Sequence, residues 1–247
     1  MLYLQKKIIM KRICLWSGPR NISTALMYSF AQRNDTRVFD EPLYAHYLAV
    51  TGADHPGKDE VLKSMDNDGM SVIRNVILAE YQDEVVFFKQ MAHHLIMIDD
   101  SFLKDVVNLI LIRNPKQIIA SFRKVIPEFS IHDIGIKKQF EIYQNLISMN
   151  LNPLIIDSGE ILKNPERMLT KLCDNLGISF DKKMLSWNAG PKKEDGVWAK
   201  YWYENVHKST GFGIHKQDET EIPENLYSLY NECRQYYEKL YEKSLKL

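Results

Sequence analysis

The stretch CLWSGPRNISTALMYSF, residues 14–30, decides the fold of this 247-residue chain. A short apolar run ends at Trp16, residues 17–21 have little helix preference, and a helical pattern opens at Ser23. A strand, a tight basic loop and a helix N-terminus in this order suit an anion, because the first amides of a helix are unpaired and carry partial positive charge. The sequence therefore predicts that residues 17–24 hold a phosphate or a similar oxyanion.

The side chains of this loop support the same interpretation. Gly18 allows a tight turn, Arg20 adds a full charge with bidentate geometry, and Ser23 and Thr24 offer hydroxyls beside the free amides. The loop is not a Walker A motif, since GxxxxGK[ST] is absent and no lysine precedes Ser23. A plain strand-to-helix turn capped by Ser23 is the alternative at this point.

Apolar runs alternate with helical patterns along the rest of the chain. This alternation predicts an α/β fold of three layers, with helices on both faces of a central parallel sheet. Ligands of such sheets sit at the carboxyl ends of the strands, where the strand order reverses. Strands are expected at residues 12–17, 36–39, 84–89, 106–112 and 153–157, and helices at 23–33, 43–50, 69–82, 116–125, 132–149, 165–177 and 223–243.

Composition limits the other classes of function. The 32 basic and 32 acidic side chains balance, so nothing points to nucleic acid or a membrane surface as partner. Three scattered cysteines fit a reduced, cytoplasmic protein better than a disulfide framework, and no Cys/His cluster suggests a metal. We expect a single domain over residues 1–247, with residues 1–9 as an N-terminal extension before a natural start at Met10. The chain is expected to be a monomer or a homodimer.

A second basic motif follows the apolar run at residues 106–112. Arg113 stands at the end of that run, Asn114 and Pro115 follow, and Ser121 comes eight residues after the arginine. An arginine at a strand end and a hydroxyl two turns into the next helix form a second candidate phosphate site. A strand-end salt bridge for Arg113 and a packing role for Ser121 are the structural alternatives.

Together these motifs resemble the sulfotransferases that use 3′-phosphoadenosine 5′-phosphosulfate (PAPS). Gly18 and the run Pro19-Arg20-Asn21-Ile22-Ser23-Thr24 align with the family's 5′-phosphosulfate loop, P-[KR]-S-G-T-T. Arg113 and Ser121 match its 3′-phosphate segment, and IDSGEILKNPERMLTKLCDNLGI, residues 156–178, matches a late family segment. Ile22 replaces the usual glycine, so the loop must cradle the sulfate with a different backbone. This variant loop is similar to that of uncharacterised bacterial and plant sulfotransferase-like proteins.

The resemblance implies transfer of a sulfuryl group from PAPS to a hydroxyl or amine of a small molecule. This transfer leaves adenosine 3′,5′-bisphosphate (PAP) as product and is expected to need no metal. Arg20 matches the basic residue of the family loop and is expected to stabilise charge on the leaving group. As the base that takes the acceptor's proton, His93 is the first candidate and Glu41 the second, and Lys89 and His94 lie beside them in the sequence. The histidines are candidates because cytosolic sulfotransferases carry lysine and histidine near this place.

Residues 190–215 are rich in glycine, lysine and aromatic residues and have no clear periodicity, which is typical of a long active-site loop. Lys208 is a candidate for the 3′-phosphate, and Trp198, Trp202 and Tyr203 are candidates for stacking on adenine or shaping the acceptor pocket. Two other functions stay open: a nucleotide or nucleoside kinase-like transferase, and a degenerate nucleotide-binding protein without catalysis. The sequence does not identify the acceptor.

Overall fold

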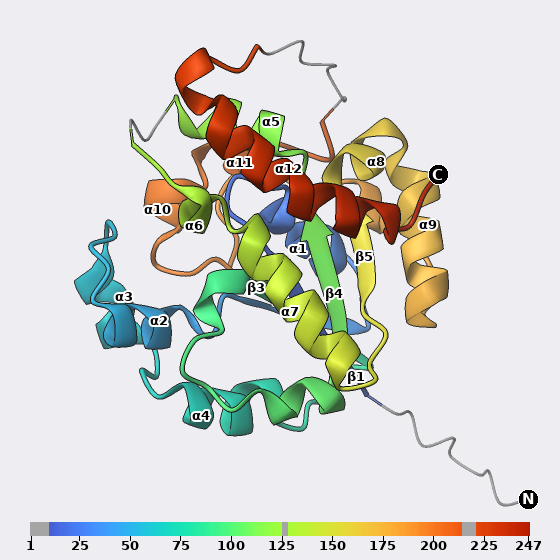
Figure 1. Ribbon diagram of the computed structural model, residues 1–247. Helices are drawn as coiled ribbons and strands as arrows, with labels where there is room; N and C mark the ends of the chain where they lie inside the picture. The colour runs from blue at the N-terminus through green and yellow to red at the C-terminus, as the bar shows by residue number, and fades with distance from the viewer. Residues whose placement is uncertain (1–9, 125–127, 214–220) are drawn as a thin grey trace, which may run out of the picture.

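The computed structural model describes residues 10–124, 128–213 and 221–247. Within them, a central sheet of five parallel strands lies between two layers of helices, as the sequence predicts (Figure 1). The strands are β1 (Lys11–Ser17), β2 (Thr36–Asp40), β3 (Val85–Met91), β4 (Val107–Ile112) and β5 (Leu154–Asp157). The helices are α1 (Ser23–Ala31), α2 (Tyr44–Thr51), α3 (Lys58–Ser64), α4 (Gly69–Val72), α5 (Pro115–Phe122), α6 (Ile131–Ile134), α7 (Ile136–Ser148), α8 (Ser158–Lys163), α9 (Pro165–Leu176), α10 (Ala199–Trp202), α11 (Glu204–His207) and α12 (Tyr227–Glu242).

The strand order β2-β3-β1-β4-β5 places the site. The chain leaves β1 toward β2 and β3 on one side, and later adds β4 and β5 on the other. The carboxyl ends of β1, β3 and β4 therefore meet where the direction of winding reverses, which is the ligand position of an open α/β sheet. The two basic motifs predicted from the sequence follow β1 and β4, on either side of this point.

Successive side chains of each strand alternate between two cores, because side chains of a strand point to opposite faces. Cys14 and Trp16 pack on the face that α5, α7 and α12 cover, while Ile13 and Leu15 pack on the face of α1 and α9. In Figure 1, α7 and α12 cross in front of the sheet and α1, α8 and α9 lie behind it.

Two predicted helices are shorter than expected. The pattern over 69–82 gives only α4, which passes at Val72 into one π-helical turn, Ile73–Ile77. The pattern over 132–149 is interrupted at Gly135, which has a φ of 78° and ends α6 before α7 begins. Apolar periodicity does not register this break, because Ile134 and Ile136 are buried on both sides of it.

The expected extension, residues 1–9, and part of the predicted loop, residues 214–215, lie outside the described residues. The described part of that loop, 190–213, contains the short helices α10 and α11 instead of irregular chain alone. Among the described residues, no helix is long and apolar enough to cross a bilayer. No cluster of three or more His, Cys, Asp or Glu side chains arranged to hold a metal is found there either.

Candidate active site

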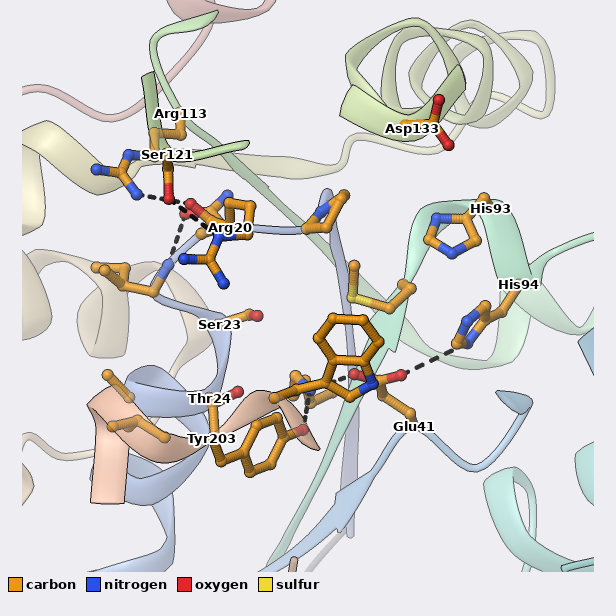
Figure 2. Close-up of a pocket in the computed structure, with 18 of the residues that line it drawn as sticks. Arg20, Ser23, Thr24, Glu41, His93, His94, Arg113, Ser121, Asp133 and Tyr203 are labelled. Atoms are coloured by element: carbon orange, nitrogen blue, oxygen red, sulfur yellow. Dashed lines mark hydrogen bonds and ion pairs between the residues drawn. The ribbon is translucent and has the colours of Figure 1, made fainter. Parts of the chain in front are cut away.

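A cavity of about 840 Å³ opens at the carboxyl ends of the strands. It is large enough for a nucleotide together with part of a second small molecule, since ligand pockets usually measure about 300–1,000 Å³. One end is lined by the loop after β1 and by Arg113 and Ser121, and the other by residues after β2 and β3, including Glu41 and His93. The two predicted anion motifs thus face the same cavity (Figure 2).

The loop after β1 adopts positive φ at an unexpected residue. Ile22 has a φ of −89° and precedes α1, whereas Arg20 has a φ of 54°. The residue with left-handed backbone in this loop is therefore Arg20 and not Ile22. The first amides of α1, at Ser23, Thr24 and Ala25, have no acceptor within the helix and line the cavity.

Gly18 shapes the loop from outside the cavity. It is not one of the lining residues described, and a Cβ atom there would lie 2.7 Å from the carbonyl oxygen of Ile134. The α6–α7 junction therefore rests directly on the loop backbone. Gln139 of α7 adds a second tie, since its Nε2 donates to the carbonyl oxygens of Trp16 (3.1 Å) and Leu111 (2.7 Å) at the ends of β1 and β4. A single polar residue on the buried side of an amphipathic helix is the sequence signal for this role.

The two basic motifs are in direct contact. The Nε of Arg20 donates to Ser121 Oγ at 2.9 Å, and Nη1 of Arg113 donates to the carbonyl oxygen of Arg20 at 2.6 Å. Asn21 fixes the other side of the loop through a bond to the carbonyl oxygen of Leu111. The two predicted anion motifs therefore lie side by side in one cavity, and the Arg20 side chain connects them. Among the described residues, Arg20 forms no ion pair with a carboxylate, so its charge remains available to a ligand.

A buried charge network occupies the floor beside the loop. Lys89 Nζ donates to Asp40 Oδ1 (2.9 Å), to Glu41 Oε1 and to the hydroxyl of Tyr203 (2.6 Å). The Lys89 and Asp40 side chains are 2 % and 1 % exposed, and Glu41 lies at the edge of the network, 9 % exposed. Glu41 is thus a buried carboxylate paired with Lys89, and not an exposed turn residue.

The network holds two carboxylates around one cation. Burial raises the pKa of Glu41, and the nearby Asp40 carboxylate raises it further, while Lys89 opposes both. Burial works against the charge of Lys89, but Asp40 and Glu41 together raise its pKa well above its usual value. A cation that stays protonated is a poor proton acceptor, so Lys89 is better suited to fix the carboxylates than to accept a proton.

His93 and His94 lie on the turn after β3, four and five residues after Lys89. His94 Nδ1 is 3.9 Å from Glu41 Oε2 and has no hydrogen-bond partner among the described residues. Burial lowers the pKa of His93 to about 4 and that of His94 well below its usual value. Both imidazoles are therefore neutral at pH 7, and Figure 2 shows His94 directed toward the Glu41 carboxylate.

Lys208, the candidate for the 3′-phosphate, and the buried histidine of α2, His46, lie outside the cavity lining among the described residues. His46 is buried, with Nδ1 accepting from the amide of Gly69 (3.1 Å) and Nε2 facing the carbonyl oxygen of Ile96 (2.9 Å), so both ring nitrogens serve the fold. Lys208 is exposed, pairs with Glu204 one turn away, and is not one of the described residues that line the cavity. The structure therefore does not bring Lys208 to the 3′-phosphate position.

The end of the cavity near Glu41 and His93 also contains two tyrosines that no sequence motif indicated. Tyr44 and Tyr47 of α2 pack their rings against His94 at centroid distances of 4.9 and 4.8 Å, and His55 accepts from or donates to the Tyr44 hydroxyl at 2.8 Å. Both tyrosines follow a helical pattern typical of an ordinary core, so no sequence signal separates them from packing residues. Trp202 of α10, a candidate from the sequence, also lines the cavity.

Most of the sequence matches one protein family. Residues 10–229 match the sequence model of the sulfotransferase domain. The chain belongs to the sulfotransferase family. The fold and the order of the basic motifs agree with this assignment.

Relatives and solved structures give further findings. The chain is 43 % identical over 225 residues to branched-chain-amino-acid aminotransferase-like protein 2 of Arabidopsis thaliana, covering 91 % of this chain and 40 % of the relative. It therefore spans about two fifths of the length of that relative. The fold is similar to the sulfotransferase domain from the curacin biosynthetic pathway (TM-score 0.58, 17 % identity, 97 % and 99 % of the two chains). It is also similar to a sulfotransferase from Alicyclobacillus acidocaldarius (TM-score 0.56, 12 % identity, 95 % and 97 %).

Proposed function

We propose that this sulfotransferase moves a sulfuryl group from PAPS to a hydroxyl or amine of a small molecule. The observation that carries the proposal is the contact of Arg20 with Ser121 and Arg113 at one end of a cavity that reaches Glu41 at the other. The 3′- and 5′-phosphates of PAPS hang from a single ribose, so they need two anion sites side by side.

The donor end suits this ligand. The amides at the start of α1, with the hydroxyls of Ser23 and Thr24, suit the 5′-phosphosulfate. Arg113 and Ser121 suit the 3′-phosphate, with Arg20 between the two groups. Phe212, Val206 and Leu162 line the same end of the cavity and offer apolar surface to the adenine ring.

Arg20 is assigned to charge stabilisation. An arginine side chain does not give up its proton in a protein, so it acts electrostatically on the leaving phosphate oxygen and not as an acid. Its Nε is held by Ser121, while its two Nη groups have no protein partner among the described residues. Two free donors in a fixed plane match an oxyanion that gains charge as the sulfuryl group departs.

We assign the proton transfer to Glu41 in preference to His93. The bond between sulfur and the bridging phosphate oxygen breaks, a bond from sulfur to the acceptor oxygen or nitrogen forms, and the acceptor's proton passes to Glu41 Oε2. Glu41 is suited to this step because burial raises its pKa above its usual value, whereas burial lowers that of His93 to about 4. His94, with Nδ1 3.9 Å from the same oxygen, is placed to orient the carboxylate.

The other functions have distinct signatures. A kinase-like transferase lacks support from the loop, because no lysine stands before Ser23. A degenerate binding protein would keep the donor end and lose the acid–base end, yet Lys89, Asp40 and Glu41 form an intact network. A small-molecule acceptor and a cytoplasmic location are part of the proposal.

The direct experiment supplies ³⁵S-labelled PAPS and a pool of hydroxylated and amine-containing metabolites, and follows label transfer. Transfer by the wild type that disappears in Glu41→Gln, with PAP binding retained, supports the proposal. PAP binding without transfer to any pool favours the non-catalytic alternative, and tight Mg-ATP binding without PAP binding favours the kinase-like one.

A further inference from the structure

Tyr203 is buried between the 190–213 segment and the sheet, and all hydrogen-bonding positions of its hydroxyl are used. The hydroxyl donates toward Asp40, with distances of 2.9 and 2.8 Å to Oδ1 and Oδ2. It accepts from Lys89 Nζ at 2.6 Å and from Trp198 Nε1 at 3.2 Å. One donor and two acceptor positions are the full capacity of a phenol oxygen.

Lys89 is satisfied in the same way. Its ammonium has three protons, and it meets three acceptors, on Asp40, Glu41 and Tyr203. The lysine therefore has a fixed position between the two carboxylates only while Tyr203 supplies the third acceptor. A buried ammonium with one proton unpaired would move toward the acceptor that attracts it most.

Asp40 depends on the same segment. Besides Lys89 and Tyr203, it accepts from the amide of Gly196 at 3.2 Å. Tyr203 and Gly196 both belong to the 190–213 segment, whose later residues, among them Phe212, also line the cavity. The charge that surrounds Glu41 is thus set partly by a segment that forms another part of the cavity wall.

We propose that Tyr203 is a positioning residue that holds Lys89 between Asp40 and Glu41 and thereby sets the basicity of Glu41. This inference rests on the proposed function, in which Glu41 takes the proton. Without the phenol oxygen, Asp40 loses a donor and attracts Lys89 more strongly, so Glu41 loses part of its cationic partner. A carboxylate farther from a cation has a higher pKa, so Glu41 becomes ionised only at higher pH.

Tyr203→Phe tests the inference, and Tyr28→Phe is its matched control. Tyr28 is also buried, and its hydroxyl donates to Asp195 of the same segment, but it touches neither Lys89 nor Asp40 in the described structure. We expect Tyr203→Phe to move the acid limb of the kcat profile upward by roughly one pH unit, with PAP affinity within about twofold of wild type. We expect Tyr28→Phe to leave the limb in place.

A second measurement does not depend on turnover. The carboxyl band of Glu41, identified in infrared difference spectra by its loss in Glu41→Gln, reports the ionisation of that group directly. An upward shift of its titration in Tyr203→Phe alone supports the positioning role. An unchanged titration, or an equal shift in both tyrosine variants, overturns it. A shifted titration in a protein that transfers no sulfuryl group would sink the proposed function and leave the positioning role standing.

Discussion

Nη1 of Arg113, at the end of β4, donates to the backbone oxygen of Arg20, at the end of β1, across 2.6 Å. This bond makes the second basic motif a support for the first, because Arg113 holds the backbone of Arg20 while the Arg20 side chain contacts Ser121. Arg113 thus has two roles: its guanidinium is assigned to the proposed 3′-phosphate, and it also fixes the loop for the proposed 5′-phosphosulfate.

Replacement of Arg113 tests the donor end. Arg113→Ala removes a charge-assisted contact worth about 1.5–3 kcal/mol, so the dissociation constant of PAP should rise roughly 10- to 150-fold in calorimetry. Arg113→Lys keeps the charge without the planar donor pair, so its dissociation constant for PAP is expected to lie between those of the wild type and Arg113→Ala. Affinity unchanged in both variants would remove Arg113 from the site.

Arg20→Ala separates binding from catalysis. The guanidinium is assigned to charge that develops in the transition state, so kcat should fall much more than PAP affinity. Steady-state kinetics and calorimetry on the same preparation give both numbers. A loss of affinity with kcat preserved would show that Arg20 only binds the ground state.

Glu41→Gln tests the proton acceptor. Loss of a general base usually costs about 10²- to 10⁴-fold, and we expect kcat to fall within that range while PAP still binds. Glu141→Gln is the control, since Glu141 also lines the cavity but lies outside the Lys89 network. Equal effects of the two substitutions would argue against a specific role for Glu41.

Gly18→Ala tests the contact between the loop and the α6–α7 junction. The added Cβ atom would lie 2.7 Å from the backbone oxygen of Ile134, and relief of such overpacking typically costs about 1–3 kcal/mol of unfolding free energy. Gly213→Ala is the control, since among the described residues, apart from its chain neighbours, no atom lies within 4 Å of a Cβ atom there. Urea unfolding measures both variants, and equal stability of the two would disprove the close contact.

His93 gives the protein a pH-dependent stability. Its pKa is about 4 in the folded protein against 6.5 normally, so between these values the unfolded chain binds a proton that the folded chain does not. The free energy of unfolding should therefore fall as the pH drops from about 6.5 toward 4, by up to about 1.4 kcal/mol per unit from this group. Urea unfolding at pH 7 and pH 5 measures this change. The free energy of unfolding is expected to fall less between these pH values in His93→Gln than in the wild type, and an identical fall would contradict a neutral His93 imidazole in the folded protein.

The fold and the strand-end positions of the two basic motifs could be predicted because their signals are local. Apolar runs, the helix start at Ser23 and the motif from Arg113 to Ser121 each lie within one element and its flanking loop. The positive φ of Arg20 could not be predicted, because no local pattern marks this residue for a left-handed backbone. The contact between Arg20 and Ser121 joins residues 101 positions apart, which no local pattern encodes.

The acid–base end was harder to predict because its chemistry depends on burial. Histidine near Lys89 looked like the better base, since its ordinary pKa suits neutral pH. Packing against Tyr44 and Tyr47 buries the imidazoles and lowers their pKa, while the same burial raises that of Glu41. Tyr203 reaches the network from 114 positions away, through a segment without periodicity.

The central claim is that the cavity holds a nucleotide with phosphates on both the 3′ and 5′ positions. Calorimetric titration of the wild-type chain with PAP, and separately with Mg-ATP, tests this most directly. The account predicts that PAP binds more tightly than Mg-ATP and that Arg113→Ala removes most of the difference. Tighter binding of Mg-ATP, or no detectable binding of PAP, would contradict it.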